Sequence, residues 1–180
     1  MKKNNKQYRF CKNVLQQSPL FEGLDEACLD DMLTLFRNEQ WERGTQQDAA
    51  IFQQRFFLIV QGRVELFRVN PETGKSITLF ILGPGDGIDI MALLNTQCAH
   101  YLQASALEPV SLISVPLTVA RQWIEQHPQF NRSFLPYLGK QMSQMEELAS
   151  DLALYDTMTR LARLILRNIV PQSRQDGDEH

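Results

Sequence analysis

The chain has 180 residues, of which 43% are hydrophobic and 22% charged, which suffices for one globular core with an appendage. Its formal net charge of −3 argues against a protein that coats nucleic acids, and three widely spaced cysteines without a CxxC pair argue against a disulfide framework or zinc ribbon. Since the sequence shows neither a secretory signal nor a membrane-spanning run of about 20 apolar residues, we expect a cytoplasmic protein.

The first 36 residues combine a basic start with a helical pattern. Five basic residues occur before residue 13 with no acid among them: Lys2, Lys3, Lys6, Arg9 and Lys12. We expect residues 1–17 to form a basic arm or helix that is either solvated, like most chain ends, or binds phosphate. Ser18 followed by Pro19 is typical of a helix cap and first turn. The next helix has one apolar face that we assign to the core: Leu29, Met32, Leu33 and Phe36.

Residues 38–115 contain short apolar runs separated by turn residues, a pattern that predicts β-structure. We expect strands at Glu39–Glu42, Ile51–Val60, Arg63–Val69, Ser76–Leu82, His100–Ala106 and Val110–Val115. Asn70–Gly74 and Gly83–Asp86 are predicted to be tight turns. Because no helical period separates the strands, the pattern favours a sandwich or rolled barrel over a parallel α/β sheet.

A helical pattern returns after Val115. We expect a short helix at Leu117–Gln126 and a long one over about residues 129–154, kinked in its first turns by Pro136 and Gly139. Apolar residues of the long helix recur at steps of 4, 3, 4 and 3, as in a coiled-coil seam: Leu138, Met142, Met145, Ala149 and Leu152. This seam predicts a homodimer in which two copies pair through the helix; the alternative is that the helix folds back onto its own barrel.

One more helix is expected after residue 156, with Asp156 or Thr157 as its cap. Its apolar face consists of Leu161, Leu164, Ile165 and Ile169. Three arginines share another face and are candidates for contact with DNA phosphates: Arg160, Arg163 and Arg167. A solvated basic face is the alternative interpretation. Without an element that enters a groove, these arginines do not read base edges.

Several short motifs occur in the order and spacing of a known family. They are Ser18–Leu24, Trp41–Gly44, Gly62–Phe67, Leu82–Asp86 and Ala92–Leu94. Together they resemble the cyclic-nucleotide-binding domain of CRP/FNR-type bacterial transcription regulators. The resemblance extends over residues 15–170, nearly the whole chain.

This resemblance implies a mainly β fold with helices: a double-stranded β-helix (jelly roll), a long dimerisation helix and a winged helix-turn-helix that binds DNA. Residues 18–127 would then be the sensor domain, residues 128–155 the dimerisation helix, and residues 156–180 the hinge and first helix of a DNA-binding domain. The sequence continues into no recognition helix or wing. We therefore expect DNA as a partner only if a missing C-terminal domain is present.

The sequence departs from the family in the segment that would hold a cyclic phosphate. Family members that bind cyclic AMP carry Gly-Glu-Leu and then Arg-Ser/Thr-Ala, whose glutamate accepts a ribose hydroxyl and whose arginine pairs with the phosphate. Here the glutamate position falls on Ile90, the arginine position near Cys98 and the Ser/Thr position near Ala99. No Arg or Lys lies between Lys75 and Arg121. Because a desolvated phosphate without a cation is costly, an ordinary cyclic nucleotide is not the expected ligand.

Another small molecule or a gas is the effector that we expect. The candidate pocket residues lie in the same stretch: Asp86, Ile88, Asp89, Ile90, Met91, Cys98, Ala99 and His100. Cys98 and His100 would share one strand face, and with Met91 they offer residue types that ligate haem iron, so haem is one candidate cofactor. A packed or solvent-exposed role is the alternative. Asp86 and Asp89 either bind a cationic or hydroxyl-bearing ligand or cap a turn.

Catalysis and metal binding are not expected. Metal-dependent cupins gather several His and carboxylates inside the barrel, whereas only His100 of the three histidines lies in the β region, and no nucleophile–base pair is legible. The sequence thus predicts the effector-sensing and dimerising module of a CRP/FNR-like regulator, with no membrane contact. The alternative is a stand-alone, non-catalytic binding or scaffold protein with a vestigial pocket.

Overall fold

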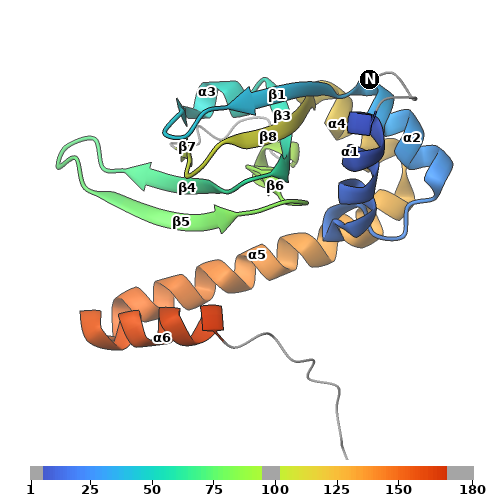
Figure 1. Cartoon of the computed structure of the whole chain (residues 1–180). Helices are drawn as coiled ribbons and strands as arrows, with labels where there is room; N and C mark the ends of the chain where they lie inside the picture. The colour runs from blue at the N-terminus through green and yellow to red at the C-terminus, as the bar shows by residue number, and fades with distance from the viewer. Residues whose placement is uncertain (1–5, 95–101, 170–180) are drawn as a thin grey trace, which may run out of the picture. The chain divides into compact units, whose positions relative to one another are not determined.

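The computed structural model describes residues 6–94 and 102–169 (Figure 1). Its contacts divide the chain into two compact units, residues 1–140 and residues 141–180. The first unit contains the N-terminal helices, both sheets, α4 (Leu117–Gln126) and the start of α5 (Pro128–Leu154). The second contains the rest of α5 and α6 (Thr157–Ile169). None of the helices in the described residues is long and apolar enough to cross a membrane.

The N-terminal helices begin at polar caps. They are α1 (Lys6–Gln17), the 3-10 turn η1 (Pro19–Phe21) and α2 (Glu26–Leu35). Ser18 Oγ accepts the N–H of Leu20 at 3.2 Å, which confirms the predicted cap, although the helix it starts is only a single turn. Asp25 Oδ1 accepts the N–H of Cys28 at 2.7 Å and so caps α2.

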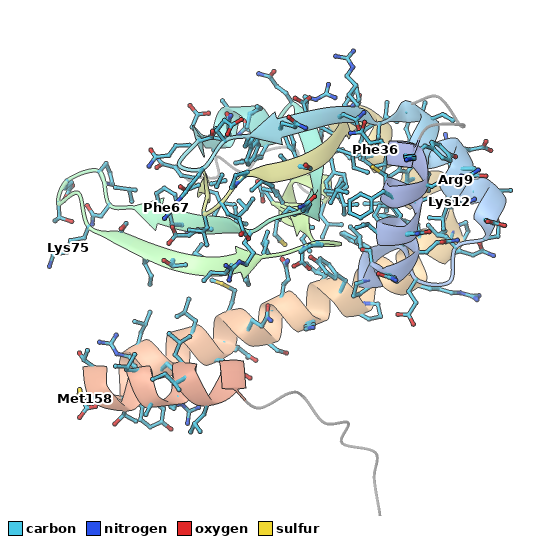
Figure 2. All side chains as sticks on the ribbon, in the orientation of Figure 1. Arg9, Lys12, Phe36, Phe67, Lys75 and Met158 are labelled. Atoms are coloured by element: carbon cyan, nitrogen blue, oxygen red, sulfur yellow. The ribbon has the colours of Figure 1, made fainter. Side chains whose placement is uncertain are left out.

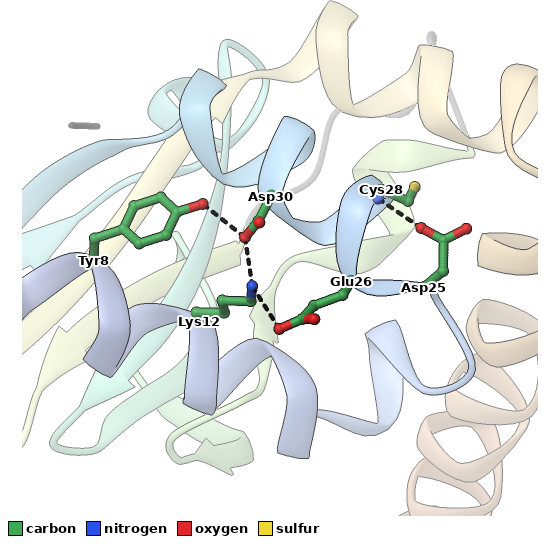
Figure 3. A network of polar contacts seen from close by, with 6 residues as sticks. All are labelled: Tyr8, Lys12, Asp25, Glu26, Cys28 and Asp30. Atoms are coloured by element: carbon green, nitrogen blue, oxygen red, sulfur yellow. Dashed lines mark hydrogen bonds and ion pairs between the residues drawn. The ribbon is translucent and has the colours of Figure 1, made fainter. Parts of the chain in front are cut away.

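A polar network fixes α1 against α2 (Figure 3). The Tyr8 hydroxyl donates to Asp30 Oδ1 at 2.8 Å, and Lys12 Nζ lies 2.8 Å from the same oxygen and 2.9 Å from Glu26 Oε1. The hydrogen bonds to Asp30 and Glu26 raise the pKa of Lys12 to about 12. Burial and the bond to Asp30 raise the pKa of Tyr8 to about 12. Lys12, which the sequence groups with the basic arm, therefore has its partners inside the fold.

Two antiparallel four-stranded sheets form a β-roll, as the sequence predicts. The first sheet has the order β1 (Arg37–Trp41), β8 (Val110–Pro116), β3 (Arg55–Gln61) and β6 (Gly87–Ile88). The second has the order β2 (Gln46–Gln47), β7 (Leu102–Ala106), β4 (Val64–Val69) and β5 (Ser76–Leu82). Figure 1 shows the sheets as facing layers, with α1, α2 and α4 gathered beside one end. Lys75 lies at the tip of the β4–β5 hairpin (Figure 2).

Alternation along β3 separates two hydrophobic clusters, because successive side chains of a strand point to opposite faces. Phe57 and Ile59 belong to a roll cluster together with residues of both sheets. Phe56, Leu58 and Val60 belong to a helical cluster, in which residues of α1, α2, α4 and α5 cover the outer face of the first sheet. The uninterrupted apolar run of β3 is therefore explained by burial on both faces.

The predicted strand at Ile51–Val60 is wrong in its first part. Residues 49–52 form the short helix α3 (Ala49–Phe52), and β3 begins only at Arg55. Asp48 Oδ1 accepts the N–H of Ala50 at 3.0 Å. This cap stabilises a helix at a place where the apolar residues alone favour a strand. The two-residue strands β2 and β6 are too short to leave a sequence period. The predicted His100–Ala106 strand starts at Leu102 within the described residues.

The turn between β3 and β4 requires glycine. Gly62 has φ +88°, and a Cβ added there would lie 2.6 Å from the carbonyl oxygen of Pro109 and 3.1 Å from Val110 Cα. Both the left-handed backbone and the close approach exclude a larger residue. Gly62 thereby holds the start of β4 against the turn before β8.

Candidate functional site

The candidate pocket residues lie in a corner segment, residues 83–94, which follows β5 and contains β6 and the 3-10 helix η2 (Ile90–Leu93). Its turn closes on itself, because Asp86 N–H donates to the Gly83 carbonyl at 3.0 Å and Asp86 Oδ2 accepts Gly83 N–H at 2.9 Å. Ile59 of β3 bonds to both sides of the turn, accepting from Gly85 at 2.8 Å and donating to the Asp86 carbonyl at 3.0 Å. The corner segment is therefore fixed to a central strand.

Two helical elements also hold the corner segment. Ser18 Oγ donates to the Gly85 carbonyl at 2.5 Å. The hydroxyl of Tyr137, on α5, donates to Asp86 Oδ1 at 3.0 Å and accepts the N–H of Gly87 at 3.3 Å. Tyr137 is only 5% exposed. A buried phenol therefore links the corner segment to the first half of α5.

Asp86 caps the turn, which is one of the two roles open to it from the sequence. One carboxylate oxygen accepts Gly83 N–H at 2.9 Å and the other accepts the Tyr137 hydroxyl at 3.0 Å. Charge-assisted hydrogen bonds of this kind are about twice as strong as neutral ones. Both oxygens of the carboxylate are thus used inside the fold.

The next pocket candidates have different surroundings. Ile88 belongs to the roll cluster, whereas Ile90 belongs to the helical cluster and Met91 is 44% exposed. Asp89 is buried and has φ +48°, the single positive φ of a non-glycine residue within the described part of the chain. This left-handed turn redirects the backbone between the two clusters. Cys98, Ala99 and His100 lie outside the described residues.

Sequence reasoning missed three residues that position the corner segment. Arg121, on α4, donates to the Ala92 carbonyl from Nε at 3.1 Å and from Nη2 at 2.6 Å, and so holds the end of η2. Arg121, Tyr137 and Ser18 are far from the corner segment in sequence, and only Ser18 carried a local signal, its helix cap. Arginine therefore does reach this segment, but its guanidinium binds a backbone carbonyl.

A shallow cleft of about 260 Å³ lies outside the roll. Residues of η1 and α5 line it: Pro19, Glu22, Arg132, Ser133, Pro136, Tyr137 and Lys140. Ser133 Oγ donates to the Leu20 carbonyl at 2.8 Å and joins the two walls. Across residues 6–94 and 102–169, no three His, Cys, Asp or Glu side chains are grouped so that they could hold a metal ion.

The predicted dimerisation seam divides into two parts along α5. Leu138 is half-buried and packs against the helical cluster. Further along the helix, Met142 is 63%, Met145 36% and Leu152 44% exposed, and Ala149 is exposed as well. The later seam residues thus leave apolar surface open in the single chain.

The arginines predicted to lie near DNA have contacts within the second unit. Arg163 Nε lies 2.9 Å from Asp151 Oδ1, and its guanidinium carbon lies 4.7 Å from the centre of the Tyr155 ring. Asp151 is 7% exposed, so this pair joins α6 to the end of α5 from a largely buried carboxylate. Arg160 donates to Thr157 Oγ1 at 3.1 Å. The side chain of Arg167 lies outside the described residues.

Comparison with known proteins identifies the family of the roll. Residues 46–127 match the cyclic nucleotide-binding domain family. The chain is 29% identical over 114 residues to the global nitrogen regulator of Synechocystis sp., covering 63% of this chain and 50% of that protein. It is 21% identical over 169 residues to the CRP-like cAMP-activated global transcriptional regulator of Mycobacterium tuberculosis, covering 91% of this chain and 73% of that protein.

A solved structure agrees with these matches. The catabolite activator protein of Thermus thermophilus superposes with a TM-score of 0.62 at 28% identity, covering 75% of this chain and 62% of that one. The chain spans about half the length of the global nitrogen regulator that it matches. The two antiparallel sheets, the corner segment and the long helix that follows α4 agree with the same assignment. Residues 46–127 therefore match the cyclic nucleotide-binding domain family, and the chain is similar to CRP-like transcription regulators.

Proposed function

We propose that the chain is the effector-sensing and dimerising module of a CRP/FNR-like transcription regulator and that it does not use the ordinary cyclic-nucleotide phosphate cassette. The observation that carries the proposal is the buried bond from Tyr137 to the corner segment. The module senses a small molecule or gas in the β-roll, catalyses no reaction, and changes the placement of α5. DNA becomes a partner only through a further C-terminal domain.

Coupling in this proposal rests on the shared hydroxyl of Tyr137. A ligand that shifts the corner segment has to break the bonds to Asp86 and Gly87 or carry the start of α5 with it, because both bonds end on one atom. Each hydrogen bond contributes about 1 kcal/mol net. A difference of about 1 kcal/mol in the free energy of two conformations changes the ratio of their populations several-fold. The link is thus strong enough to transmit binding and weak enough to be reversed by it.

The proposed ligand class follows from where the cations lie. A cyclic phosphate needs a partner of opposite charge when it is desolvated. Arg121 is the arginine that reaches the corner segment in the described residues, and its Nε and Nη2 donate to the Ala92 carbonyl. The relative from Mycobacterium tuberculosis is named cAMP-activated, and we propose that this chain differs from it in ligand. Haem is a candidate cofactor in this proposal, and Cys98, His100 or Met91 would supply a ligand to its iron.

Pairing in this proposal uses the exposed part of the α5 seam. Met142, Met145 and Leu152 recur at heptad steps and are open to solvent in the single chain. Burial of apolar area stabilises association by about 25 cal/mol per Å². A second copy presents the same stripe, so the two helices would cover each other's apolar residues.

The ligand part is tested by thermal unfolding of the purified chain with cyclic AMP, cyclic GMP or haem. Neither nucleotide should change the Tm. A nucleotide that bound the folded chain would raise the free energy of unfolding by about 2.7 kcal/mol at a concentration 100 times its Kd. A rise of several degrees with cyclic AMP contradicts the proposed departure from the cassette. Haem should give an absorption spectrum that changes in His100→Ala and Cys98→Ala if these residues ligate iron; an unchanged spectrum removes them as ligands.

The pairing part is tested by sedimentation of Met145→Lys. The unchanged chain should sediment as a dimer and Met145→Lys as a monomer, because a lysine on the seam would bury an unpaired charge. Met158→Lys is the matched control, since Met158 is 74% exposed and lies on α6, outside the seam (Figure 2). A dimeric Met145→Lys contradicts the seam. A monomeric unchanged chain that no effector stabilises would instead indicate a non-catalytic scaffold protein.

A further inference from the structure

Away from the corner segment, a nucleophilic side chain lies against a base. Cys28 Sγ, on α2, is 3.5 Å from Nδ1 of His127, although the two residues are 99 positions apart. Both side chains are half-buried, so they are reachable from solvent. A thiol at this distance from an imidazole has the geometry in which the ring nitrogen takes up the thiol proton.

His127 occupies the junction between α4 and α5. Its N–H donates to the Trp123 carbonyl at 2.9 Å and ends α4, and its own carbonyl accepts the N–H of Phe130 at 2.9 Å in the first turn of α5. The contact with Cys28 is therefore a contact between α2 and this junction. A group added to the sulfur has to displace the imidazole from it.

The charge around Cys28 selects the kind of reagent that reaches it. Burial, and next the carboxylates of Asp25 and Asp31, raise the pKa of the Cys28 thiol. The thiol therefore needs a base to lose its proton as the sulfur attacks. The same two carboxylates attract a cationic reagent and repel an anionic one.

Cys11 provides an internal comparison. Its side chain is 1% exposed, and burial raises its pKa as well. It lies on α1 within the helical cluster. The pKa is therefore raised for both thiols, but only Cys28 is accessible to solvent. The reaction rate of Cys11 serves as the reference for a thiol buried in the core.

We propose that Cys28 is a modification site for small cationic disulfides, with His127 as the base. The sulfur of Cys28 attacks one sulfur of the reagent, a new S–S bond forms, and the S–S bond of the reagent breaks. The thiol proton passes to His127 Nδ1 and then to the departing thiolate, which leaves as a thiol. Cys28 is oxidised to a mixed disulfide, and the reagent disulfide is reduced.

The test uses the full chain with cystamine, a cationic disulfide, and oxidised glutathione, an anionic one, at equal concentration. Mass spectrometry of peptides follows modification of Cys28 and Cys11 with time. We expect Cys28 to react at least tenfold faster than Cys11, and at least tenfold faster with cystamine than with oxidised glutathione. Added salt should reduce the preference for cystamine, because it screens Asp25 and Asp31.

Two variants separate the base from the charge. His127→Gln should slow the reaction of Cys28 about tenfold, while Gln126→Ala, the neighbouring control, should leave it unchanged. Asp25→Asn/Asp31→Asn should remove the preference for cystamine but keep the dependence on His127, since asparagine still caps α2. Thermal unfolding verifies that each variant is folded. Equal rates for the unchanged chain and His127→Gln, or for Cys28 and Cys11, overturn the proposal.

Discussion

The corner segment and the helices after residue 141 carry the two halves of the proposed function, and they are built differently. The corner segment bonds to β3, Ser18, Arg121 and Tyr137, and its interior side chains are buried. In residues 141–166, the ion pair of Arg163 with Asp151 joins α6 to α5. Large apolar side chains of this region are open to solvent: Met142, Leu152, Leu154, Met158, Leu161, Leu164, Ile165 and Leu166.

The first region therefore depends on contacts within its own chain, and the second on association with another surface. The hydrogen bonds that hold the corner segment to β3, Ser18, Arg121 and Tyr137 lie within one chain, so changes there should appear in the stability of that chain. Exposed apolar surface of the second region remains to be covered, so changes on the seam should appear in association.

The largest loss of stability is expected for Gly62→Ala, in the first unit. The new Cβ would lie 2.6 Å from the Pro109 carbonyl oxygen at a φ of +88°, and clash and strain together should cost about 3 kcal/mol or more. Denaturant-induced unfolding measures the loss. Gly74→Ala is the control, because φ there is +67° with no atom within 4 Å; it should cost about 1–2 kcal/mol. Equal losses would contradict the close approach at Gly62.

Tyr137→Phe should lower the stability of the chain by about 1–3 kcal/mol, because Asp86 and Gly87 each lose a buried hydrogen-bond partner. Unfolding by denaturant gives the value, and sedimentation should show unchanged association. Tyr155→Phe is the control, since Tyr155 is 38% exposed and its hydroxyl makes no hydrogen bond to another side chain or backbone group that the structure describes. A dimer lost in Tyr137→Phe with stability retained would reverse the separation of the two regions.

Arg163→Ala should have a smaller effect that is confined to the second unit. The arginine pairs with Asp151 at 2.9 Å, but its side chain is 42% exposed, so solvent screening reduces the loss to about 1 kcal/mol. Hydrogen exchange should become faster at the amides of α6 and stay constant in the β-roll. Arg160→Ala, which removes the bond to Thr157 and leaves the Arg163–Asp151 pair intact, serves as the control. Faster exchange in the β-roll would show that the two regions are not separate.

Alkaline pH should weaken the contact between α1 and α2 only slightly. The pKa values of Tyr8 and Lys12 are raised from 10.0 and 10.5 to about 12 in the folded chain. Both groups therefore hold their protons more tightly when folded, and their contribution is complete below pH 10 and lost as the pH rises through 12. Unfolding measured across this range should show a smaller decrease for Lys12→Met than for the control Lys75→Met. An identical decrease in the free energy of unfolding of the two variants would show that Lys12 does not contribute to the pH dependence.

Much of the fold could be predicted from local signals. The boundaries of β5 and α4 agree with the sequence because periodicity and turn residues mark them, and α5 differs from its prediction by one residue. The error at Ile51–Val60 arose because an apolar run is compatible with helix or strand until the cap at Asp48 is considered. The candidate site was harder to predict from the sequence. Residues two apart in a strand share one face, yet Ile88 and Ile90 belong to different clusters.

The rolled β-structure, the resemblance to the cyclic nucleotide-binding domain and the absence of Arg and Lys between Lys75 and Arg121 could be read from the sequence, because each is carried by residues close together in the chain. The contacts that hold the corner segment depend on tertiary packing. Ser18 precedes η1, Arg121 lies on α4 and Tyr137 lies on α5, and hydrogen bonds from side chains to a distant segment leave no periodic pattern in the sequence. The contact of Cys28 with His127 has the same origin: it depends on how α2 packs beside the junction of α4 and α5.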